Sequence, residues 1–171
     1  MREARLRPDS YTVVALARSA FFAQRGLPAV RQLLSEMEGH GVPLGVECGT
    51  ALLCCLRHIP PGEEAAALEA AGQLFGRLRA LCPQQCNAAT YNSLMLVHLA
   101  AADWAGVLRV FEELEGSEVL PNSITWDLLL AACRKAGWRD KLAQFEALQK
   151  TWEVLGMPNS ARRKLSALGD A

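Results

Sequence analysis

Apolar residues recur along this chain three and four positions apart, which is the spacing of one face of an α-helix. In the middle of the chain, positions 91, 94, 95 and 98 form one such stripe, and positions 104, 107, 108, 111 and 114 form a second. Residues 101–103 separate the two stripes, and Asp103 is well placed to cap the second helix. No stretch has the sustained alternation of apolar and polar residues that is typical of strands. The pattern therefore predicts a helical hairpin.

Similar pairs of stripes occur in four units, over residues 8–42, 43–85, 86–120 and 121–157. Pro8 and Pro43 are 35 residues apart, and so are Cys86 and Pro121. The second unit is longer, 43 residues, and the turn-forming residues 58–64 are the predicted insertion that lengthens a loop. A helical period near 35 predicts an all-α fold, an α-solenoid of stacked helix–turn–helix repeats over residues 8–159. Residues 160–171 are a basic tail or the opening of a further, incomplete repeat, which would make the chain a fragment of a longer protein.

Glycine and proline mark where the predicted helices stop. Gly39, Gly41 and Pro43 follow the second helical stripe of the first unit, and Gly137 separates the two stripes of the fourth. Glycine is favoured just after a helix because it adopts the left-handed conformation without a steric penalty. We therefore expect helix ends at these positions.

The residues at the start of the third and fourth units narrow the choice of repeat. The segments Asn87-Ala-Ala-Thr-Tyr-Asn-Ser-Leu-Met95 and Pro121-Asn-Ser-Ile-Thr-Trp-Asp-Leu-Leu129 share a Thr, an aromatic residue and a polar residue before two apolar ones. Cys133-Arg-Lys-Ala-Gly137 lies at a predicted turn. These segments resemble the pentatricopeptide repeat, and the resemblance covers about residues 8–159. The Trp-x-x-Leu-Gly opening of tetratricopeptide repeats is not found in register.

The resemblance implies a non-catalytic reader of single-stranded RNA, in which each hairpin faces one base. In that family the base-reading residue follows the Thr-Tyr pair, and its partner follows the next junction proline. The implied pairs are Asn92 with Asn122, a combination that the family associates with pyrimidines, and Asp127 with Asn159. Asn has no advantage inside a helix, so we expect Asn92 to face the binding groove and its loss to leave thermal stability nearly unchanged.

The first two units offer less for base recognition. The equivalent pair in the second unit is Gly49 with Asn87, and in the first unit it is Val14 with Leu44, whose side chains cannot form hydrogen bonds. The asparagines at all three partner positions also precede predicted helices. Helix capping is therefore an alternative reason for them, and both roles can coexist.

Composition and charge limit the kind of partner. The chain has 171 residues, 51% of them apolar, with 18 basic and 18 acidic residues and no net charge. This balance excludes a strongly basic protein that coats nucleic acid, and no apolar run is long enough to span a membrane. The basic residues nearest the C-terminus are the candidates for phosphate contact: Arg134, Lys135, Arg162, Arg163 and Lys164. For the last three, a solvated tail is the alternative reading.

No motif of an enzyme is present in the sequence. A Gly-rich phosphate loop, a G-x-S-x-G elbow and an H-E-x-x-H helix are all missing. Cys82 and Cys86 form a C-x3-C pair without the second pair that a structural zinc site needs. We expect no catalysis, cofactor, metal, membrane or small-molecule substrate, and we expect the six cysteines to be reduced.

Two functions from different classes remain open. The first is single-stranded RNA binding in organellar RNA processing, stability or translation, with the resemblance implying a mitochondrion or plastid. The second uses the same scaffold as a protein-interaction or ribosome-associated adaptor in a ribonucleoprotein. The Asn92 and Asn122 pair favours the first function, whereas the neutral charge and the apolar Val14 and Leu44 favour the second.

Overall fold

The structure, a computed structural model, describes residues 8–155, with side chains described up to Trp152. These residues form helices joined by turns, without a strand among them. The helices are α1 (Ser10–Phe22), α2 (Gly26–His40), α3 (Val46–Leu56), α4 (Glu64–Leu81), α5 (Ala88–Ala100), α6 (Trp104–Gly116), α7 (Ser123–Ala136) and α8 (Arg139–Leu155). Each range that the sequence predicts as a unit holds two of them. Within the described residues, no helix is both long enough and apolar enough to cross a bilayer.

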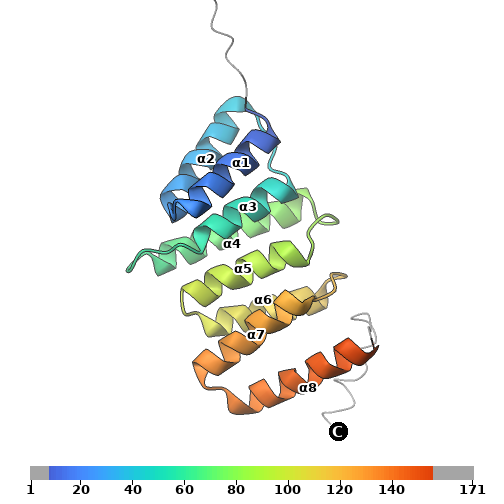
Figure 1. Cartoon of the computed structure of the whole chain (residues 1–171). Helices are drawn as coiled ribbons and strands as arrows, with labels where there is room; N and C mark the ends of the chain where they lie inside the picture. Colours follow the sequence, from blue (N-terminus) through green and yellow to red (C-terminus); the bar gives the residue numbers. More distant parts are fainter. Residues whose placement is uncertain (1–7, 156–171) are drawn as a thin grey trace, which may run out of the picture.

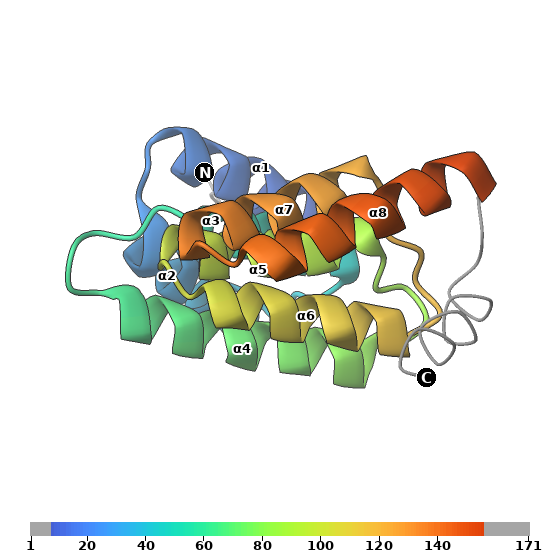
Figure 2. The ribbon, with the colours of Figure 1, turned by 90° about the horizontal axis from the view of Figure 1, so that it is seen from below.

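The hairpins stack in chain order from α1 to α8 (Figure 1). The first helices of the hairpins, α1, α3, α5 and α7, pack successively against one another in one layer. The second helices α2, α4 and α6 lie behind this layer, and each packs both against its own partner and against the first helix of the next hairpin (Figure 2). The predicted all-α solenoid of stacked helix–turn–helix repeats is therefore confirmed. We call the exposed side of α1, α3, α5 and α7 the first-helix face.

The apolar stripes form one continuous core between the two layers. Two aromatic pairs occupy corresponding places at successive junctions. Phe75 of α4 packs on Tyr91 of α5 with ring centroids 5.1 Å apart, and Phe111 of α6 packs on Trp126 of α7 at 5.4 Å. Trp126 has no solvent exposure, so its truncation to Ala would cost about 3–5 kcal/mol. At the first junction, the sulfur atoms of Met37 and Cys48 lie 3.6 Å apart.

The turns follow the local signals of the sequence. The side chain of Asp103 caps α6 by accepting a hydrogen bond from the backbone N–H of Gly106 at 2.8 Å. Gly41 and Gly137 end α2 and α7 with φ of 67° and 73°, the left-handed conformation that favours glycine. Residues 57–63 form the long loop between α3 and α4, where the insertion was predicted.

All six cysteines are free thiols. Burial raises the pKa of Cys48 and of Cys55 to about 11, so neither is a ready nucleophile near neutral pH. In the described part of the chain, no three His, Cys, Asp or Glu side chains gather as metal ligands would.

Candidate nucleic-acid interface

The fold brings Asn92 and Asn122 into direct contact across two hairpins. Asn92 lies in the second turn of α5, and Asn122 is the N-cap of α7. The amide Nδ2 of Asn92 donates a hydrogen bond to Oδ1 of Asn122 at 3.0 Å, and Oδ1 of Asn92 accepts one from the hydroxyl of Thr125 at 2.8 Å. These three side chains therefore tie α5 to the first turn of α7.

Asn92 itself is nearly closed to solvent. Only 4% of its surface is exposed, and its partner Thr125 is fully buried. The sequence-based expectation that Asn92 faces an open groove is therefore wrong, because the first turn of α7 covers it. Both ends of its amide already have partners inside the protein, so removing the side chain would cost two hydrogen bonds in a closed junction.

Asn122 is the more accessible member of the pair. Its Oδ1 accepts from the backbone N–H of Thr125 at 3.0 Å, and its own backbone N–H donates to the Thr125 hydroxyl at 3.1 Å, which completes a capping box. Among the described residues, its Nδ2 group donates to no acceptor, and the residue is half-buried. Ile124 lies in the same turn and is 54% exposed. This edge therefore presents an amide donor beside an apolar surface.

The other residues predicted to read bases do not form a hydrogen-bonded pair like that of Asn92 and Asn122 among the described residues. Asn87 is exposed and caps α5, accepting from the backbone N–H groups of Ala89 at 3.0 Å and Thr90 at 3.3 Å, so capping accounts for its side-chain oxygen. Asp127 is exposed on α7, and its predicted partner Asn159 lies outside the described residues.

The second and first hairpins cannot place a polar reader as the third does. A Cβ added at Gly49 would lie 2.5 Å from both Cδ atoms of Leu78, so α4 already occupies the space that a side chain would need. In the first hairpin, Val14 is half-buried and Leu44 is buried. The hydrogen-bonded reader geometry is therefore confined, among these three hairpins, to the α5–α7 junction.

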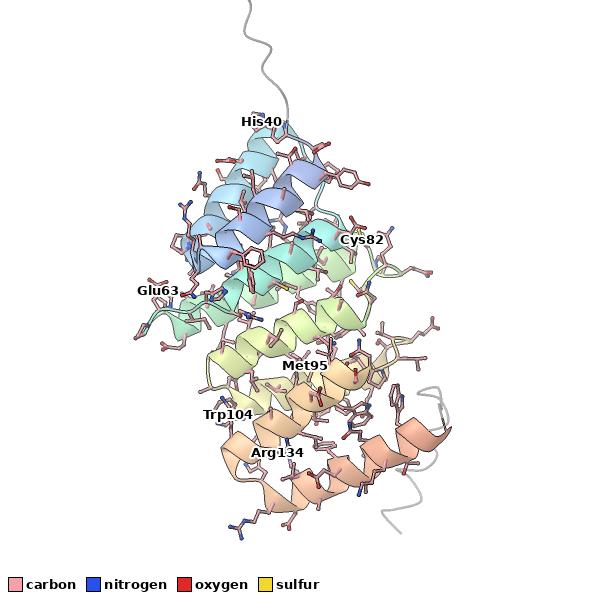
Figure 3. The ribbon with its side chains drawn as sticks, viewed as in Figure 1. His40, Glu63, Cys82, Met95, Trp104 and Arg134 are labelled. Carbon is pink, nitrogen blue, oxygen red and sulfur yellow. The ribbon has the colours of Figure 1, made fainter. Side chains whose placement is uncertain are left out.

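The described phosphate candidates lie on α7 and are exposed, but each already has a partner. Arg134 is paired with Glu146 of α8 at 3.3 Å, and Figure 3 shows it on the front of the stack. The Nζ of Lys135 lies 5.6 Å from the centroid of the Trp104 ring. Arg162, Arg163 and Lys164 lie outside the described residues.

Sequence reasoning missed a second feature of the first-helix face. A groove of about 790 Å³ runs between α1 and α3 and reaches the start of α5. Its lining includes Arg18, Phe21 and Phe22 of α1 and Arg57, which follows α3. The adjacent residues Phe21 and Phe22 were the signal available in the sequence. Successive residues of a helix point in different directions, so the core cannot cover both rings equally.

The fold and this face define a helical-repeat protein with a polar junction and a groove on one side of the stack. No protein-family model matches the chain, and no curated protein matches it.

Proposed function

We propose that this protein binds single-stranded RNA without catalysis, through the first-helix face of a solenoid of the pentatricopeptide type. The observation that carries the proposal is the 3.0 Å hydrogen bond between Asn92 and Asn122. The resemblance names these two residues as one base-reading pair although they lie 30 positions apart, and they meet at a junction between hairpins. Repeat proteins that recognise one base per repeat read it with two or three side chains, and this junction brings two such side chains together.

In this proposal the two asparagines have different tasks. Asn92 is buried and holds the carbonyl side of Asn122, so it positions its partner. The Nδ2 group of Asn122 then donates to the Watson–Crick edge of a base, and the exposed side chain of Ile124 gives the base an apolar surface. Cytosine offers the acceptors O2 and N3 to such a donor, which fits the pyrimidine preference that the resemblance implies.

The biological setting of the proposal follows from the resemblance alone. Pentatricopeptide proteins act on organellar RNA, so the proposed setting is RNA processing, stability or translation in a mitochondrion or plastid.

Fluorescence anisotropy with short labelled RNAs tests the proposal. Wild-type protein should bind cytidine-rich single strands better than adenosine-rich strands or duplex, more tightly at low salt than at moderate salt. Asn122→Asp keeps a good helix cap but replaces the amide donor with a carboxylate, which accepts only. We expect affinity for cytidine-rich RNA to fall about fivefold or more relative to uridine-rich RNA, because a carboxylate facing the N3 position meets an acceptor in cytosine but an N–H donor in uracil.

Asn87→Asp is the matched control. It makes the same charge change at an N-cap of the same layer, and the residue that corresponds to Asn92 for this cap is Gly49, which has no side chain to pair with it. An equal shift in the cytidine-to-uridine ratio for both variants would contradict the assignment to Asn122. Failure of the wild type to bind any single strand at low salt would remove the RNA proposal altogether.

A protein-interaction adaptor is the second candidate, favoured by exposed apolar surface on α1. Tyr11 is 79% exposed, Leu16 44% and Phe22 81%. Large apolar side chains exposed on one helix favour a surface that a protein partner covers. If RNA binding is absent at low salt, capture of a partner by the wild type and not by a Tyr11→Ala, Leu16→Ala double variant would support this function.

A further inference from the structure

The groove between α1 and α3 combines aromatic rings with guanidinium groups. The rings of Phe21 and Phe22 lie 5.5 Å apart in an edge-to-face arrangement, and the Arg57 guanidinium lies 4.6 Å from the centroid of Phe21. Phe22 is 81% exposed and lines the groove, as does Arg18 one turn earlier on α1. The groove thus offers an open aromatic face, with one arginine already oriented by stacking on the neighbouring ring.

Several arginines of the molecule are paired with carboxylates, but the two arginines of this groove are not, within the described residues. Arg77, Arg79, Arg109 and Arg134 each form an ion pair with a carboxylate. Within the described part of the chain, neither Arg18 nor Arg57 forms one, and Glu47 is the single acidic residue in the groove lining. The groove therefore carries a surplus of positive charge in a protein with no net charge.

We infer that this groove is a sequence-independent anchor for single-stranded RNA, in which a base stacks on Phe22 while Arg18 and Arg57 contact phosphates. The inference rests on the proposed function and names what the first hairpin contributes to it. Every base has a π-face, so stacking on an aromatic ring tolerates any sequence, and arginines neutralise the backbone. Since Val14 cannot form a side-chain hydrogen bond, this end of the face adds affinity and no base selectivity.

The groove reaches the start of α5, the helix that also carries Asn92. Asn87 lines its far edge and caps α5, and the same helix carries Asn92 one turn further along. A strand lying across the first-helix face can therefore occupy the groove and the junction together. Two linked contacts of this kind raise the affinity beyond that of either alone, because the second contact becomes intramolecular.

Anisotropy titrations of paired variants test the anchor. Phe22→Ala should lower affinity about fivefold or more for cytidine-rich and adenosine-rich single strands alike, as expected from the loss of one stacked base. Tyr11→Ala is the matched control, since Tyr11 is 79% exposed on the same helix but lies outside the groove lining. Arg18→Gln should reduce the slope of log K against log salt by about 0.7, whereas Arg31→Gln on α2 should not.

Each outcome separates the anchor from the function on which it rests. If the wild type binds RNA and Phe22→Ala behaves like Tyr11→Ala, the anchor is wrong and the RNA proposal stands. If Phe22→Ala changes the ratio between cytidine-rich and adenosine-rich strands, the groove reads bases and is no neutral anchor. If the wild type binds no RNA, but binds an acidic, Phe-containing peptide that Phe22→Ala no longer binds, both proposals fall and the groove belongs to a protein partner.

Discussion

The first and third hairpins share one arrangement of helices but differ in the chemistry of their first-helix face. In the third hairpin, Asn92 is buried and hydrogen-bonded to the next hairpin. At the corresponding position of the first hairpin, Val14 lines an open groove with Phe22. The difference teaches that a hairpin can join the stack through its apolar stripes without a polar contact at this position, because both hairpins pack into the same core. The residue at the position of Asn92 and Val14 can therefore differ between hairpins. What each hairpin can bind differs with it.

In the second hairpin the corresponding residue is Gly49, and substitution there has the largest effect that we expect from comparing these positions. Gly49→Asn would install the reader of the third hairpin, but its Cβ would collide with Leu78 of α4. Overpacking together with a buried, unsatisfied amide should lower the free energy of unfolding by about 3 kcal/mol. Urea denaturation monitored by circular dichroism measures this loss.

Gly72→Asn is the control for that substitution. Gly72 lies on the exposed side of α4, and a Cβ added there meets no atom within 4 Å. Asn is slightly better than Gly inside a helix, so stability should change by less than about 0.5 kcal/mol. Equal effects of the two substitutions would show that the second hairpin has room for an asparagine side chain at position 49. The second and third hairpins would then not differ in this respect.

The buried position of Asn92 leads to a second, smaller effect. Asn92→Ala should cost about 2 kcal/mol of stability, because the hydroxyl of Thr125 and the carbonyl of Asn122 lose partners in a closed junction. Thr125→Val and the double variant complete a cycle, in which a coupling of at least about 0.5 kcal/mol is expected for side chains in contact. Strictly additive losses would mean that the hydrogen bonds do not join α5 to α7 energetically.

Those features that depend on nearby residues could be predicted from the sequence. The three- and four-residue spacing of apolar positions located the helices, and Asp103, Gly41 and Gly137 marked their ends, because caps and stops act within one turn. The capping alternative for the asparagines is likewise local, and the structure shows it for Asn87 and Asn122.

Features that depend on contacts between residues far apart in the sequence could not be predicted. Asn92 is buried because α7 begins directly over it, and its own helix carries no signal of that approach. The groove lies between two hairpins, and Arg57 of the second hairpin stacks on Phe21 of the first. The glycine at position 49 is explained by Leu78, a residue of a later helix. In each case one position in the sequence is governed by a side chain far from it along the chain.

The smallest expected effect concerns the turn between the two helices of a hairpin, which differs between the third hairpin and the first. The side chain of Asp103 caps α6 and accepts from His98 at 2.9 Å and from Arg109 at 3.2 Å, whereas α2 follows Arg25 without a side-chain cap. Partial burial of the Asp103 carboxyl acts to raise its pKa, but the Gly106 N–H, His98 and Arg109 together hold that pKa below the usual 3.8. Asp103→Ala should therefore cost about 1 kcal/mol at neutral pH.

The pH dependence of that effect follows from the lowered pKa. A carboxyl group with a lower pKa in the folded state stabilises the fold above its unfolded pKa, and this contribution is lost as the pH falls through the folded value. Asp103→Asn keeps an oxygen for the cap and removes the titrating charge, so its stability should approach that of the wild type as the pH falls below about 4. Thermal melts between neutral pH and pH 3 measure the difference. A gap between wild type and Asp103→Asn that stays constant over this range would show that the charge of Asp103 does not stabilise the third hairpin, and its advantage over the first would reduce to the cap alone.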